Sequence, residues 1–230
     1  MSRTRLWAPR ADSSSGKYTG VHCAVCASPI GGAGNKLEMA VQRPSEETVM
    51  TPPADPMDFW RDTYQKALSE ENTLDFGSFS HADAWALGSA MVDAATKNNY
   101  PVAIAIVFGE QRVFHAALEG SSAANDDWLA RKFRAVYKHN CSSWALECQQ
   151  RAMGGDYYSD SGYRTAEVAL AGGAVPLRVR GSLIGAVGVS GLAGEDDHYF
   201  VLDAMTTYVK SCRTHAGSVV QVRPFLTTGQ

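Results

Sequence analysis

The chain has 230 residues, of which 45% are hydrophobic and 20% are charged, and its formal net charge is −3 at pH 7. This composition predicts an ordinary globular domain, and the slightly acidic balance argues against a nucleic-acid-binding protein. No apolar stretch approaches the roughly 18 residues of a membrane span. The five scattered cysteines favour a reducing compartment over a disulfide framework. We therefore expect a cytoplasmic protein that binds neither a membrane nor nucleic acid.

The two ends of the chain have the composition of linkers and tails. Residues 1–56 are rich in Gly, Ser and Pro and offer little apolar surface, so we predict a disordered N-terminal extension. Cys23 and Cys26 within it have a zinc-like spacing, but no second ligand pair follows nearby, which favours an incidental pair. The pattern predicts a single domain over residues 57–213 and a tail over 214–230.

The first half of the domain contains two predicted helices and a predicted hairpin. Apolar residues recur at helical spacing from Asp58 to Leu68 and again from His81 to Asn98. Ser80, followed three residues later by an aspartate, predicts a capping box at the start of the second helix. Residues 101–108 and 112–118 are β-branched runs separated by a short turn, which predicts two antiparallel strands.

A long amphipathic helix is predicted next, capped within residues 125–127 and running to about Met153. Most of its charges lie opposite the apolar stripe, as on a solvated face. Lys132 differs because it lies at the border of the stripe, where its ammonium can point into a cleft.

The second half ends in a predicted hairpin, a glycine-containing loop and an acidic helix. Val175–Val179 alternates apolar and polar residues, and Leu183–Val189 follows after a short turn. The loop from Ser190 to Gly194 breaks this strand and leads into the closing helix, over residues 196–212. The order of elements predicts an α+β fold, an antiparallel sheet of two hairpins with helices packed on it.

The polar residues around this loop form the candidate site. Glu195, Asp197 and His198 are a candidate metal set, because neutral imidazole binds iron and a nearby carboxylate can fix its tautomer. Ser190 at the start of the loop completes the group. Helix capping by Asp196 or Asp197, with the imidazole bonded to a backbone carbonyl, explains the same residues without a ligand.

Several of these segments together resemble the HbpS-like, or haem-degrading, domain family, and within it the UPF0303 branch. The resemblance covers roughly residues 58–212. Its motifs are GGAVPLRVRG, IGAVGVSGL and EDDH near the C-terminus, and the N-x-x-W-x-x-R-K…SS pattern carried by Asn125, Trp128, Arg131, Lys132, Ser142 and Ser143. Relatives often have a histidine before the Gly-Gly pair, whereas this chain has Ala171.

The resemblance implies a profilin-like α/β sandwich, a homo-oligomer and a haem ligand, with haem degradation as the implied activity. The residues expected to bind the cofactor are His198, Lys132, Arg131 and Ser190. An alternative of another class stays open, a non-catalytic oligomeric scaffold or adaptor that buries its glycine-rich hairpin against a second copy.

Overall fold

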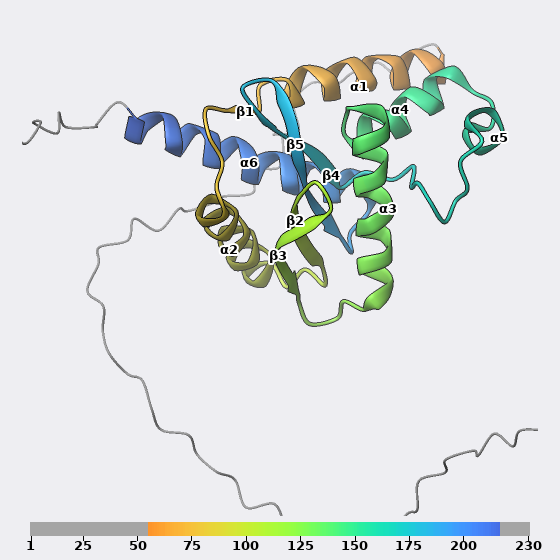
Figure 1. The fold of residues 1–230 in the computed structure, drawn as a ribbon. Helices are drawn as coiled ribbons and strands as arrows, with labels where there is room; N and C mark the ends of the chain where they lie inside the picture. Colours follow the sequence, from red (N-terminus) through yellow and green to blue (C-terminus); the bar gives the residue numbers. More distant parts are fainter. Residues whose placement is uncertain (1–54, 217–230) are drawn as a thin grey trace, which may run out of the picture. The chain divides into compact units, whose positions relative to one another are not determined.

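The computed structural model describes residues 55–216, which form a five-stranded sheet with helices on both of its faces (Figure 1). The helices are α1 Pro56–Glu71, α2 His81–Lys97, α3 Ala123–His139, α4 Ser143–Met153, α5 Tyr157–Ser161 and α6 Gly194–Ala216. The strands are β1 Asp75–Phe76, β2 Ala103–Phe108, β3 Gln111–Ala117, β4 Ala174–Val179 and β5 Ser182–Ser190.

The sheet has the strand order β1-β4-β5-β2-β3. Strands β2 and β3 form one antiparallel hairpin, β4 and β5 form another, and β2 joins the two by pairing antiparallel with β5. The fold is therefore mixed α+β. The expectation of a purely antiparallel sheet is wrong, because β1 pairs parallel with β4. A strand of two residues is too short for its hydrophobic period to be recognised in the sequence.

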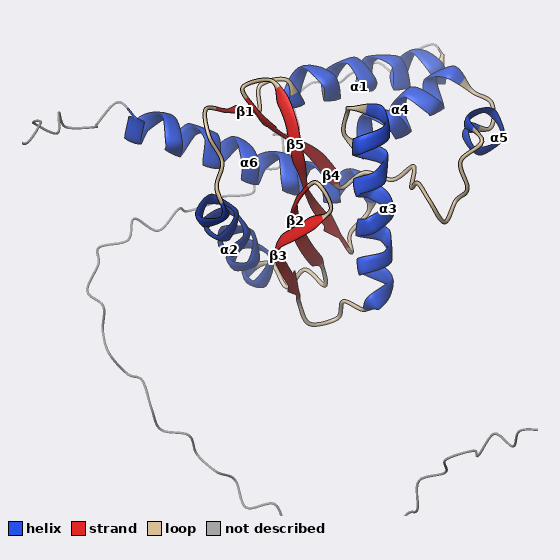
Figure 2. Ribbon diagram, in the orientation of Figure 1, coloured by secondary structure: helices blue, strands red, loops and turns tan. Residues whose placement is uncertain are grey.

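Helices cover the sheet in two layers (Figure 2). Helices α2 and α6 pack on one face, in a core that includes Ile104 of β2 and Val187 of β5. Helix α3 packs on the other face through Leu129 and Phe133, which contact small sheet residues such as Ala186. Alternate residues of β2, β4 and β5 therefore pack against different helical layers, as the period of a strand requires.

The small residues of β5 are explained by contacts inside the chain. A Cβ at Gly185 would lie 1.8 Å from the carbonyl oxygen of Val107 in β2, and one at Gly188 would lie 2.6 Å from the Phe133 ring. Because β5 is paired on both sides, the β4–β5 hairpin lies in the interior of the sheet. The small residues of β5 therefore have an explanation within one chain, and packing of the hairpin against a second copy stays a prediction.

The predicted long helix is two helices, which is a second correction. Helix α3 ends at Asn140, whose φ of 55° is left-handed, and the Ser142 hydroxyl caps α4 by accepting from the Ala145 amide at 3.0 Å. The cap of α3 is Ser122, one turn earlier than predicted. The apolar stripe continues through both helices, so its periodicity alone hides the break.

The predicted start of α2 and the packing of α1 both depend on side-chain contacts with backbone amides. The capping box of α2 is confirmed, with the Ser80 amide donating to the Asp83 carboxylate at 2.7 Å and the Asp83 amide to the Ser80 hydroxyl at 3.3 Å. Helix α1 packs on α4, where the Glu71 carboxylate accepts from the Ser142 amide at 2.8 Å. This bond ties the end of α1 to the start of α4.

The predicted N-terminal extension and C-terminal tail, including Cys23 and Cys26, lie almost wholly outside the described residues. At the two boundaries the helices extend further than predicted, since α1 begins at Pro56 and α6 reaches Ala216. Among residues 55–216, no helix combines the length and hydropathy that crossing a membrane requires.

Candidate functional site

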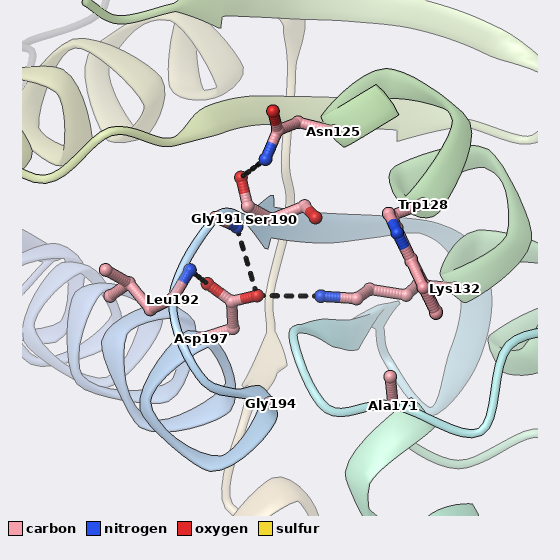
Figure 3. A pocket seen from close by; sticks show the side chains of 9 residues that line it. All are labelled: Asn125, Trp128, Lys132, Ala171, Ser190, Gly191, Leu192, Gly194 and Asp197. Atoms are coloured by element: carbon pink, nitrogen blue, oxygen red, sulfur yellow. Dashed lines mark hydrogen bonds and ion pairs between the residues drawn. The ribbon is translucent and has the colours of Figure 1, made fainter. Parts of the chain in front are cut away.

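A pocket of about 240 Å³ lies where the end of β5 and the loop into α6 meet the first turns of α3 (Figure 3). Its lining consists of Asn125, Trp128, Lys132, Ala171, Ser190, Gly191, Leu192, Gly194 and Asp197. Three separate parts of the chain therefore build it: helix α3, the segment before β4, and the β5–α6 loop.

A buried ion pair forms one wall of this pocket. The Lys132 ammonium of α3 lies 2.8 Å from the Asp197 carboxylate of α6, and the two side chains are 3% and 2% exposed. Lys132 also donates to the carbonyl oxygen of Val189 at 3.1 Å. Burial lowers the pKa of Lys132 and raises the pKa of Asp197, and the attraction between the two groups opposes both shifts. Each charge thus depends on the other for its stability in the interior.

Asp197 also organises the loop that leads into its own helix. One carboxylate oxygen accepts from the Leu192 amide at 3.0 Å, and the other accepts from the Gly191 amide at 3.3 Å (Figure 3). With Lys132, three donors converge on this carboxylate. Asp197 is therefore engaged in holding the loop and the lysine.

The Gly-Gly pair before β4 lets the chain pass close to the ion pair. A Cβ at Gly173 would lie 2.7 Å from the Lys132 ammonium nitrogen and 2.8 Å from the Asp197 Cβ. A Cβ at Gly172 would lie 2.1 Å from the carbonyl oxygen of Gly194. Side chains at either position would displace the pocket wall, which explains why two glycines stand here.

The pocket lining also includes a hydroxyl and an aromatic ring. The Asn125 side-chain amide donates to the carbonyl oxygen of Ser190 at 3.1 Å and so ties α3 to the end of β5. The Ser190 hydroxyl points toward the side of the pocket where Trp128 and Lys132 lie (Figure 3), and it makes no hydrogen bond among the described residues. Trp128 is 41% exposed, and the Arg131 guanidinium lies 3.9 Å from its ring centroid.

Only some of the predicted cofactor-binding residues line the pocket. Lys132 and Ser190 line the pocket, whereas Arg131 lies beside it, bound to Asp127 at 2.9 Å and stacked on Trp128. Asn125 and Trp128 also line the pocket, although the sequence predicted neither as a binding residue and both belong to the motif that carries the resemblance. Asn125 and Trp128 lie two turns and one turn before Lys132 on one face of α3, and this helical spacing is the signal that could have identified them.

His198 does not face the pocket. Its side chain is fully buried, and its ring stacks on the Trp144 ring with 6.2 Å between centroids and an angle of 30°. Neither ring nitrogen has a hydrogen-bond partner among the described residues. Burial, assisted by the positive charge of Lys66, lowers the pKa of His198 to about 3. The expected cofactor contact at His198 therefore lies outside this pocket, and the alternative in which a backbone carbonyl accepts from the ring is wrong.

The three predicted metal ligands are not brought together. Glu195 is exposed to solvent, Asp197 is held by Lys132 and the loop amides, and His198 is buried against Trp144. Among residues 55–216 there is no group of three His, Cys, Asp or Glu side chains that could hold a metal ion. Asp197 and His198 point about 100° apart because they are consecutive residues of α6, so the carboxylate and the imidazole face different surroundings.

Comparisons with known proteins agree on one family. Residues 79–206 match the family model described as "Haem degrading protein HbpS-like". A UPF0303 protein of Streptomyces avermitilis is 37% identical over 148 residues, covering 64% of this chain and 91% of the relative.

Two solved structures are similar in fold. The structure of the Ybr137w protein aligns with a TM-score of 0.61 at 24% identity, covering 65% of this chain and 89% of that one. A structure described as a PduOC:heme complex aligns with a TM-score of 0.50 at 21% identity, covering 56% of this chain and 94% of that one.

Proposed function

The chain belongs to the HbpS-like family, within its UPF0303 group, and from this premise we propose that it is a haem-binding protein whose ligand enters the pocket beside Lys132. The family description names haem, and one protein of this fold has been solved in complex with it. Haem degradation, which the same description names, is proposed only as a reaction that would follow binding.

The observation that carries the proposal is Lys132, a lysine whose side chain is 3% exposed and which nevertheless lines an open pocket. Lysine is almost never this buried unless its charge is paired. The pairing with Asp197 keeps a charged donor at the pocket wall, where it can meet the carboxylates that haem carries.

The described pocket does not supply a ligand to the iron. Its lining contains no imidazole, thiol or thioether, which are the groups that usually hold haem iron, and position 171 carries an alanine. His198 is fully buried, stacks on Trp144 and lies outside the lining. The residues therefore favour recognition of the organic part of the ligand, and they give no support to chemistry at the iron.

Titration of hemin into the full chain tests this function. We expect the Soret band of hemin to shift and to saturate at one equivalent per chain. The Trp85→Ala variant is a matched control, because Trp85 is 69% exposed on α2 and does not line the pocket, and it should titrate like the wild type. A shift that never saturates, or none at all, would contradict haem binding and favour the oligomeric scaffold or adaptor role.

A further inference from the structure

We infer that the pocket holds one carboxylate-bearing edge of a tetrapyrrole and that the side chains lining it leave the central metal without a ligand. This inference rests on the proposed haem-binding function and names the part of the ligand that the pocket recognises.

Two hydrogen-bond donors, Lys132 and Ser190, line the pocket. An ammonium group has three N–H donors, and Lys132 uses one for Asp197 and one for Val189, which leaves one. The Ser190 hydroxyl is the second, since it lines the pocket and makes no hydrogen bond among residues 55–216. A charged ammonium and a hydroxyl donor together favour a ligand group that accepts hydrogen bonds, of which a carboxylate is the strongest.

The charge of Asp197 does not oppose such a group. Its two oxygens accept from Lys132 and from the Gly191 and Leu192 amides, so its negative charge is compensated on the loop side (Figure 3). The ligand carboxylate then meets the lysine and the hydroxyl of Ser190 rather than an uncompensated carboxylate.

The aromatic wall suits a flat, conjugated ligand. Trp128 lines the pocket while the Arg131 guanidinium lies over its ring at 3.9 Å, and Arg131 is itself fixed by Asp127 at 2.9 Å and by the carbonyl oxygen of Thr165 at 3.3 Å. The ring is therefore held in one orientation before any ligand arrives. Offset stacking of a second conjugated ring is the contact that such a surface favours.

The size of the pocket limits how much of the ligand enters. Its volume of about 240 Å³ is below the roughly 300–1,000 Å³ of pockets that enclose a drug-sized molecule. One edge of a tetrapyrrole with its carboxylate can enter, while the rest of the macrocycle, including the metal, lies at the mouth.

The test compares hemin with the iron-free porphyrin, protoporphyrin IX, each titrated into the full chain and followed by the absorbance of the ligand. Recognition of the edge predicts dissociation constants within about threefold of each other, since metal ligation contributes nothing. The Trp128→Ala and Ser190→Ala variants should each weaken both ligands, by about tenfold for the tryptophan. Trp85→Ala should leave both unchanged.

Three outcomes would overturn the inference. If hemin binds at least about tenfold more tightly than the iron-free porphyrin, the iron is ligated and only the proposed function survives. If both ligands bind but ignore the Trp128 and Ser190 variants, they bind elsewhere. If neither ligand binds, the inference and the proposed function fail together.

Discussion

Asp197 and His198 are consecutive residues at the start of α6, yet they occupy opposite kinds of environment. Asp197 lines the pocket and accepts hydrogen bonds from Lys132 and two loop amides. His198 is equally buried but stacks on Trp144, and its ring nitrogens have no partner among the described residues. Neighbouring titratable residues are thus not one site, because a helix turns about 100° between them. The pocket side is built for polar recognition, and the His198 side is part of the packing between α6 and α4.

The largest expected effect comes from breaking the ion pair. The Lys132→Met change leaves the Asp197 charge buried without its partner, and we expect a loss of roughly 3–5 kcal/mol in the free energy of unfolding. Urea denaturation measures it. Lys138→Met, on an exposed position of the same helix, is the matched control and should cost less than about 1 kcal/mol.

The double variant Lys132→Met/Asp197→Leu sharpens this test. Removing both charges should cost less than the sum of the two single changes, because the double variant leaves no buried charge without its partner. Strict additivity would show that the two groups do not stabilise each other.

The second effect concerns the packing role of His198. Replacing it with alanine opens a cavity beside Trp144, and we expect a loss of roughly 2–4 kcal/mol, as for other large-to-small core changes. Replacing it with leucine fills the space and removes two unpartnered nitrogens, so His198→Leu should lie within about 1 kcal/mol of the wild type. Thermal and urea unfolding compare the two variants, and equal stability of both would contradict a packing role.

The same residue should make stability depend on acidity. The pKa of His198 falls from 6.5 to about 3 on folding, so between these pH values the unfolded chain binds a proton that the folded chain does not. The wild type should therefore lose up to about 1.4 kcal/mol per pH unit as the pH falls below about 6.

His198→Leu isolates this contribution. Glu70 and Glu71 act in the opposite sense, because burial raises the pKa of each carboxyl and so favours the folded state on acidification. The wild type and His198→Leu share these two carboxyl groups. The difference between their free energies of unfolding therefore reports the histidine alone. Parallel stability curves from pH 7 to pH 4 would argue against a buried neutral imidazole.

Local patterns predicted local structure well. The Ser80 capping box depends on residues three positions apart, so the sequence contains all the information that the structure uses. Lys132 could be identified as a pocket residue because its place at the border of the apolar stripe follows from the helical period alone.

Features that depend on tertiary contacts could not be predicted. The break at Asn140 interrupts an apolar stripe that continues on both sides. Strand β1 forms only because the backbone of Asp75 and Phe76 pairs with β4, about 100 residues later in the chain. The direction in which His198 points depends on how α6 is rotated against α4. No motif at the start of a helix specifies that rotation.

The central claim is that the ligand binds beside Lys132 and Trp128, not at His198. The most direct measurement is the hemin dissociation constant of His198→Leu and of Trp128→Ala, side by side with the wild type. The account predicts that His198→Leu binds hemin within about threefold of the wild type, while Trp128→Ala binds about tenfold more weakly. A folded His198→Leu variant that has lost hemin binding, beside a Trp128→Ala variant that has kept it, would contradict the account.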